Sequence, residues 1–180
     1  MTTEGYLSNA ELFNGILFIL REPNSNGTVA DTFWMRDVVN GIAAGPAATK
    51  YKNRLTELVE ALGRGDELKH SAYVNIHPDS GTAQASEYYK KLSKGTKGKI
   101  AKTQCENYKA EIVFTCKDIF HDMWKAYGEP PCTEGISYHR DGTDVTLERF
   151  QTENMTVFAI YHPSMSPKLP PQSLSEVLDH

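Results

Sequence analysis

The sequence contains little cysteine, and its arrangement excludes two kinds of stabilisation. Cys105, Cys116 and Cys132 are odd in number, and no two of them are close in the chain. A disulfide framework needs paired cysteines, and a structural zinc site needs closely spaced Cys or His ligands. The pattern therefore argues against both and indicates a reducing compartment. We expect a cytoplasmic protein, or a nuclear one in a eukaryote.

Long apolar segments are also missing. No run approaches the ~20 residues of a membrane helix, and the start, "MTTEGYLSNAELFNG", lacks the basic and apolar regions of a secretion signal. Repeats, low-complexity segments and linkers are not evident. With 39% hydrophobic and 23% charged residues, the chain has the composition of an ordinary globular protein. We expect one domain over residues 1–180, monomeric and without a membrane partner.

Positive charge is scarce overall but locally concentrated. The chain has 19 Lys and Arg against 23 Asp and Glu, a formal net charge of −4. A general nucleic-acid coat protein would usually be basic. However, the segment "KKLSKGTKGKIAK", residues 90–102, contains six lysines and no acid. Two interpretations remain open: a solvated helix end and loop, or a surface that faces phosphates.

Four short apolar segments predict buried strands, at residues 16–20, 71–76, 111–116 and 155–163. Segments with helical spacing or caps separate or follow them: a helix starting at Asp31 or Thr32, then 50–65, 80–95, 99–110, 117–128 and 173–180. A short hairpin is expected over 136–150, around Asp141-Gly142. Strands alternating with helices predict an α/β fold, a three-layer α/β/α sandwich with a mainly parallel four-stranded central sheet.

Polar residues follow each predicted strand. The last strand is the clearest case, because "VFAIYHPSMSP" ends in a histidine, hydroxyls and prolines that packing does not require. Ligands of open α/β sheets bind outside the carboxyl ends of the strands. The residues expected at this edge are Arg21, Glu22, Asn24, Ser25, Asn75, His77, Lys117, Asp118, His162, Ser164 and Ser166.

Three of these strand ends together resemble the uracil-DNA glycosylase superfamily. They are "FILREPNSNG", "AYVNIHP" and "VFAIYHPSMS", in the order that the family uses, and the resemblance covers residues 15 to 170. The His-Pro-Ser match is the most specific. The resemblance implies a monofunctional DNA glycosylase that flips out uracil or a related damaged or mismatched base and hydrolyses its N-glycosidic bond, leaving an abasic site. It implies DNA containing such a base as the partner, and neither cofactor nor metal.

The resemblance also implies roles for individual residues. Glu22 would activate water and His162 would donate to a uracil carbonyl oxygen, as the catalytic pair. The base would be bound by Asn75, Phe33, Trp34 and Arg21. The DNA would be held by Asn24, Ser25, Ser164, Met165, Ser166 and Lys168.

The chemistry of base removal calls for these residue types on its own terms. The leaving base gains negative charge, which a fixed donor can stabilise by ~3 kcal/mol. The sugar gains positive charge, which a carboxylate stabilises. An aromatic ring stacks on the extruded base, and the Asn amide offers a donor beside an acceptor, as uracil requires.

The sequence departs from the family's first motif. Leu20 or Arg21 stands where a glycine is usual, and Glu22 replaces the usual Asp. The extra methylene displaces the carboxylate by about 1 Å, enough to cost ~100-fold in rate. One alternative is therefore a catalytically weak or inactive nucleic-acid-binding protein of the same fold. Another is an unrelated α/β enzyme that acts on a small nucleotide.

Each of these residues, taken singly, also has an ordinary structural explanation. Glu22 could be an exposed loop acid, and Phe33 and Trp34 could be core residues. Asn75 could satisfy loop amides, and His162 could be a buried structural histidine. Their combination at one expected edge of the sheet favours the functional interpretation.

Overall fold

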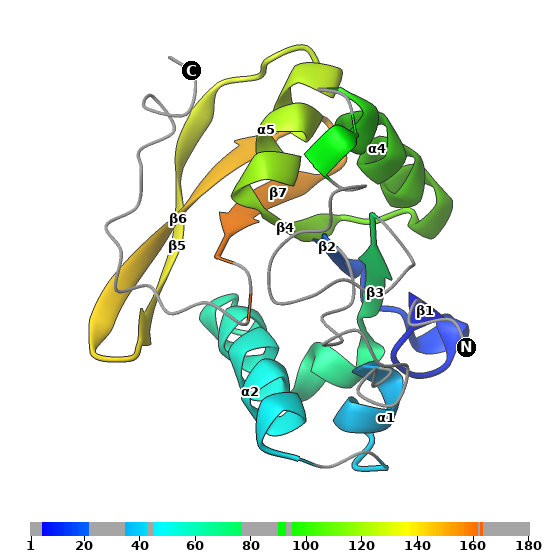
Figure 1. Ribbon diagram of the computed structural model, residues 1–180, viewed down its shortest axis with the longest axis vertical. Helices are drawn as coiled ribbons and strands as arrows, with labels where there is room; N and C mark the ends of the chain where they lie inside the picture. Colours follow the sequence, from blue (N-terminus) through cyan, green and yellow to red (C-terminus); the bar gives the residue numbers. More distant parts are fainter. Residues whose placement is uncertain are drawn as a thin grey trace.

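The computed structural model describes residues 5–21, 35–42, 45–76, 90–92, 95–161 and 163. These form a mixed α/β fold around one seven-stranded sheet with the strand order β1-β3-β2-β4-β7-β6-β5. Figure 1 shows helices α4 and α5 on one side of the sheet and α1 and α2 on the other.

The centre of the sheet consists of the four strands that the sequence predicted. They are β2 (Ile16–Leu20), β3 (Ala72–Asn75), β4 (Ile112–Cys116) and β7 (Thr156–Ile160). Every pairing among them is parallel. Their residues are apolar on both faces and nearly all buried, which is the pattern of a parallel sheet covered by helices.

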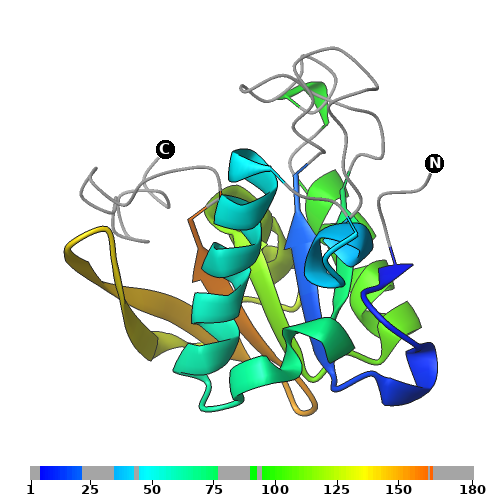
Figure 2. The same cartoon turned by 90° about the horizontal axis from the view of Figure 1, so that it is seen from below.

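The expected count of four strands is wrong for the sheet as a whole. Three antiparallel strands extend it: β1 (Gly5–Tyr6) beside β3, then β6 (Thr143–Gln151) and β5 (Cys132–Arg140) beyond β7. The hairpin turns at Asp141-Gly142 as predicted, with positive φ at both residues. It is longer than the expected 136–150, because Cys132, Thr133 and Glu134 also pair with β6. Figure 2 shows it extending to one side of the body.

The helices agree with the predicted segments where the structure describes them. They are α1 (Met35–Val39), α2 (Pro46–Ala61), α4 (Thr96–Tyr108) and α5 (Lys117–Ala126). α2 begins earlier than its apolar pattern suggested because Pro46 occupies the first turn, which tolerates proline. Short 3₁₀ helices at Ala10–Leu12 and Gly65–His70 were not predicted. The predicted helix start near residue 31, most of 80–95, and 173–180 lie outside the described residues.

A row of aromatic rings fixes which way each central strand faces. Tyr73, Phe18, Phe114 and Phe158 are level in the parallel registers, and the three phenylalanines stack in sequence with centroids 5.3 Å apart. The Tyr73 hydroxyl lies 3.2 Å from that of Tyr51 on α2. Because side chains alternate along a strand, this whole row faces α2.

On the other face, α4 and α5 approach each other closely. A Cβ on Gly98 of α4 would lie 2.1 Å from the carbonyl oxygen of Asp122 on α5. Only glycine permits this crossing. The packed pair covers β2, β4 and β7, which leaves the carboxyl ends of the strands as one edge of the sheet and the amino ends as the other.

Candidate functional site

The carboxyl ends of the four central strands are level with one another. Leu20 is in register with Asn75, and Cys116 with Ile160. Ile19 is in register with Thr115, so Leu20 lies level with Cys116. The residues after each strand therefore leave the sheet along one edge, as the sequence analysis expected. With strands ~4.8 Å apart, the edge from β3 to β7 is roughly 14 Å wide.

Asn75 lies at this edge on the α2 face of the sheet. Its side chain follows Tyr73 by two residues and is therefore on the same face, and the residue is 4% exposed. Cys116, level with Leu20 on the same face, is 1% exposed. Burial raises the pKa of the Cys116 thiol to about 12 and the pKa of Tyr51 well above its usual 10. Tyr51 and Cys116, on the sheet face that carries Asn75, are therefore uncharged at neutral pH, which suits hydrogen bonding to a neutral base.

Arg21 and Asp118 meet at the point where the sheet reverses its strand order. The chain proceeds from β2 to β3 on one side and then to β4 on the other, and such a switch point is where α/β sheets bind ligands. Arg21 Nε donates to Asp118 Oδ1 at 3.1 Å, and Lys97 Nζ lies 3.5 Å from Asp118 Oδ2. All three side chains are partly buried. Two cationic side chains therefore approach the Asp118 carboxylate at this part of the edge.

The end of β7 is tied to α2 by an arginine that the sequence analysis did not single out. Arg54, 4% exposed, donates from NH1 to the carbonyl oxygen of Pro163 at 2.5 Å and from NH2 to Asp141 Oδ2 at 2.9 Å. Arg140, 3% exposed, donates to Glu57 at 2.8 Å and to the backbone carbonyl of Arg54 at 3.0 Å. An available signal was the position of Arg54 next to Leu55 and three residues after Tyr51, on the buried side of an amphipathic helix.

Two of the predicted site residues, Arg21 and Asn75, can be placed, and both lie at the carboxyl edge on neighbouring strands. The other ten predicted site residues lie outside the described residues: Glu22, Asn24, Ser25, Phe33, Trp34, His162, Ser164, Met165, Ser166 and Lys168. Their proposed roles remain predictions. His162 is covalently joined to Tyr161 and Pro163, which are both described.

The described lysines of the segment 90–102 have different surroundings. Lys90, Lys91 and Lys99 are exposed, whereas Lys97 pairs with Asp118 at the carboxyl edge. Lys102, in the middle of α4, lies 4.9 Å from the ring centroid of Tyr127. Lys117, beside the carboxyl edge, lies 3.8 Å from Glu148 and 5.6 Å from the ring centroid of Tyr161.

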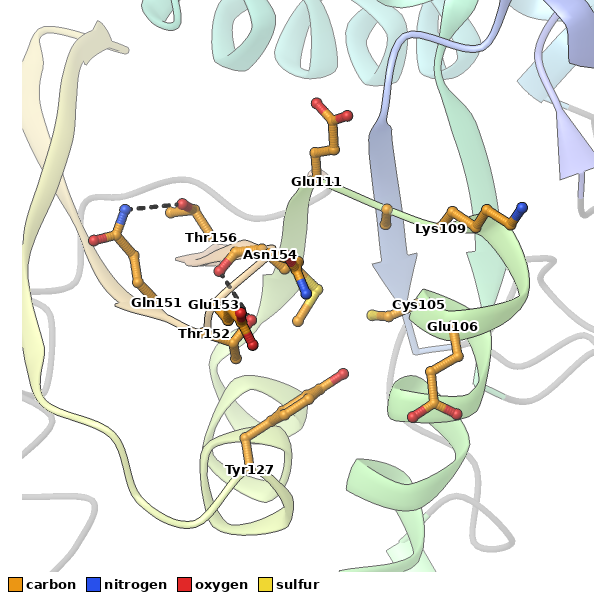
Figure 3. A pocket seen from close by; sticks show the side chains of 12 residues that line it. Cys105, Glu106, Lys109, Glu111, Tyr127, Gln151, Thr152, Glu153, Asn154 and Thr156 are labelled. Atoms are coloured by element: carbon orange, nitrogen blue, oxygen red, sulfur yellow. Dashed lines mark hydrogen bonds between the residues drawn. The ribbon is translucent and has the colours of Figure 1, made fainter.

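A cavity also lies at the amino ends of the strands. It has a volume of about 670 Å³, and Figure 3 shows Glu106, Glu111 and Glu153 among its lining residues, with Lys109 as their positive neighbour. A second cavity, of about 660 Å³, lies between α2 and the hairpin turn and is lined by Lys50, Asn53, Arg54 and Asp141 among others. The first cavity lies at the edge of the sheet opposite the predicted site. The second cavity lies next to the predicted site, because Arg54 lines it and also contacts Pro163 after β7.

Neither a metal site nor a membrane span is evident in the described part of the chain. Its His, Cys, Asp and Glu residues form no group of three that could hold a metal ion, and none of its helices is long and apolar enough to cross a bilayer.

Compared with protein-family models, with curated proteins and with solved structures, the chain gave no match. A function for the protein therefore rests on its own residues.

Proposed function

We propose that the protein is a metal-independent DNA glycosylase that removes uracil or a related damaged base by base flipping. The supporting observation is the level carboxyl edge of the parallel strands. There, Asn75 is buried at the end of β3, Arg21 follows the adjacent β2, and His162 comes two residues after the end of β7 in the sequence. The fold would be the three-layer sandwich of the uracil-DNA glycosylase superfamily, with a hairpin added to its parallel centre.

In this proposal Asn75 reads the base. A buried carboxamide at the rim of the sheet can pair with O4 and N3–H of uracil, and a well-formed bidentate pair is worth ~1–3 kcal/mol of discrimination. Its neighbours Tyr51, Tyr73 and Cys116 bring no charge into this region at neutral pH, because burial raises the pKa values of Tyr51 and Cys116. Phe33 or Trp34 would stack on the flipped base.

His162 and Glu22 would each stabilise one of the two charges that develop during the reaction. His162 would donate to the base oxygen as negative charge develops there. Glu22 would stabilise the positive sugar and orient the attacking water. The strands that lead to these residues, β7 and β2, are separated by β4, a spacing of roughly 10 Å. A nucleoside held between them would meet one group on each side.

Docking to DNA would rely on local charge, because the chain is acidic overall. Arg21 and Lys97 lie beside Asp118 at the switch point, and Lys90, Lys91 and Lys99 are exposed. Asn24, Ser25, Ser164, Met165, Ser166 and Lys168 would complete the contacts with the DNA backbone and the vacated base position. Phosphate binding of this kind weakens steeply with salt.

A cleavage assay tests the proposal. The purified protein is incubated, with a chelator present, with labelled oligonucleotides that carry one uracil, either single-stranded or opposite A or G. The products are then treated with alkali and resolved on a gel. Breaks at the uracil that require alkali and are lost in His162→Ala are expected.

Absence of breaks at uracil and at a panel of damaged bases would overturn the enzymatic proposal. The replacement of the usual first-motif glycine by Leu20 or Arg21 favours the second candidate, a binding protein that retains this fold without the reaction. Oligonucleotide binding that falls steeply with salt would support that candidate, and binding of small nucleotides with little salt dependence would indicate an unrelated α/β protein.

A further inference from the structure

We propose that Arg54 is a positioning residue, which holds the backbone beside His162 in the orientation that the reaction needs. This inference rests on the proposed function and extends it to α2, a helix outside the three sequence motifs. The supporting contact is the hydrogen bond from the Arg54 guanidinium to the carbonyl oxygen of Pro163, the residue bonded to His162.

The contact belongs to a network that joins three separate segments of the chain. Arg54 and Glu57 come from α2, Arg140 and Asp141 from the hairpin turn, and Pro163 from the segment after β7. Arg140 also donates to the backbone carbonyl of Arg54, 3.0 Å away. The side chain that donates to the Pro163 carbonyl is therefore itself anchored both to α2 and, through Asp141, to the hairpin turn.

Stability is a poor explanation for this arrangement. Arg54 and Arg140 are only 4% and 3% exposed, and removing a guanidinium from water costs several kcal/mol that its partners have to offset. Apolar residues at these positions would often stabilise the fold equally well. What a buried guanidinium adds is direction, because its planar fork donates along fixed lines. Here one of its N–H groups donates to the carbonyl oxygen of Pro163, the residue that follows the predicted catalytic histidine in the chain.

The same helix also reaches the base-reading side of the edge. One turn before Arg54, Tyr51 meets Tyr73, two residues before Asn75, with 3.2 Å between the hydroxyl oxygens. α2 therefore contacts the strand that carries Asn75 and the segment that carries His162, although these lie roughly 14 Å apart across the sheet. A rigid helix between them would keep the end of β3 and the Pro163 carbonyl at a constant separation.

The test compares Arg54→Lys with Arg64→Lys. Lysine keeps the charge but lacks the planar fork. Arg64, just after α2, makes the same kind of contact at the other edge: its NH1 donates to the carbonyl oxygen of Asn14 at 3.0 Å, and it lies 3.9 Å from Glu67. For each variant, single-turnover cleavage of a uracil oligonucleotide, its binding constant and the thermal midpoint are measured. We expect Arg54→Lys to lower the single-turnover rate at least tenfold with binding changed less than threefold, and Arg64→Lys to leave both near the wild-type values.

A second measurement does not depend on activity. The ring proton resonances of the histidines are followed by NMR, with His162 assigned from the His162→Gln variant. We expect the His162 resonance to shift in Arg54→Lys and to stay in place in Arg64→Lys. If Arg54→Lys does not fold, Asp141→Asn takes its place. The Asp141 side chain is 43% exposed, so its loss should leave the fold intact, shift the His162 resonance and lower the rate about threefold.

The outcomes separate the two proposals. A wild-type protein that releases no base overturns the glycosylase assignment, and the His162 resonance alone then decides the role of Arg54. A resonance unmoved by both Arg54→Lys and Asp141→Asn, or a fall in thermal midpoint with an unchanged rate per folded molecule, overturns the positioning role.

Discussion

The two edges of the central sheet show that the volume of a cavity does not locate a site. The amino edge has a cavity of about 670 Å³ and the carboxyl side adjoins one of about 660 Å³. The first is lined by three glutamates and one lysine, which would repel DNA. The carboxyl edge gathers Arg21, Lys97 and a buried Asn75. Strand direction and charge distinguish the edges, whereas size does not.

The largest difference between the two edges is expected in the rate of uracil release. We compare His162→Ala and Glu22→Gln at the carboxyl edge with Glu153→Gln at the amino edge. Each of the first two should reduce uracil release at least tenfold without unfolding the protein, and loss of a donor to the leaving base could cost roughly a hundredfold. Glu153→Gln should remain within twofold. Cleavage rates and circular dichroism of all three decide it. Wild-type rates in both carboxyl-edge variants would remove the assignment of the site.

A smaller effect on base preference is expected from Asn75→Ala. Comparing it with a variant on the opposite face of the sheet distinguishes the two faces of the carboxyl edge. Loss of the amide should lower the preference for uracil over other bases about tenfold, within the ~1–3 kcal/mol of a bidentate contact. The control is Thr115→Val. Thr115 is also buried and donates to the carbonyl of Ile19 at 2.7 Å, but it points to the α4–α5 face. Rates on uracil and cytosine oligonucleotides measure the preference. An equal loss in both variants would mean that general destabilisation explains the effect.

Both edges should contribute to a loss of stability at high pH, since a thiol is buried near each. Burial raises the pKa of Cys116 at the carboxyl edge and of Cys105 at the amino edge to about 12, from 9.0. The folded protein therefore holds these protons more tightly than the unfolded chain. The resulting stability is fully present below pH 9 and is lost as the pH rises toward 12. The urea midpoint should fall between pH 8.5 and roughly 10.5, and less so in Cys105→Ala and Cys116→Ala. A constant wild-type midpoint would contradict this.

The smallest difference is expected between exposed ion pairs. Arg21–Asp118 has side chains 34% and 29% exposed, and Arg64–Glu67 at the other edge has 34% and 43%. Water screens both pairs, so double-mutant cycles in urea should give coupling energies below ~1 kcal/mol for each. A coupling of several kcal/mol at Arg21–Asp118 alone would show that the switch point is a structural centre and would weaken its assignment as a binding edge.

The apolar segments predicted the parallel centre well. The segments 16–20, 71–76, 111–116 and 155–163 all contain strands in the structure, because buried parallel strands are apolar on both faces and short. The turn at Asp141-Gly142 was equally readable, since both residues adopt positive φ there. The antiparallel strands β5 and β6 alternate exposed and buried residues less regularly, and their attachment to β7 depends on pairing that no local pattern encodes.

The site was predictable to the extent that strand ends are predictable. The sequence placed Asn75 and Arg21 at strand ends, and the register makes them neighbours. It indicated only that Arg54 lies on the buried side of its helix and not what it contacts, because an arginine on a helix is ordinary until the hairpin and the segment after β7 are packed against it. Its partners Asp141 and Pro163 lie 87 and 109 residues away in the chain.

Local sequence patterns were sufficient to locate the four central strands and the hairpin turn, to mark the residues that are apolar enough to be buried, and to show which polar types follow each central strand. These are properties of neighbouring residues, set by side-chain size, branching and polarity. The tertiary structure alone decided the strand order, the level row of strand ends and the burial of Arg54 and Arg140 against their partners. Those features require segments far apart in the chain to meet, and the free energy that selects such meetings belongs to the packed molecule and to no single segment.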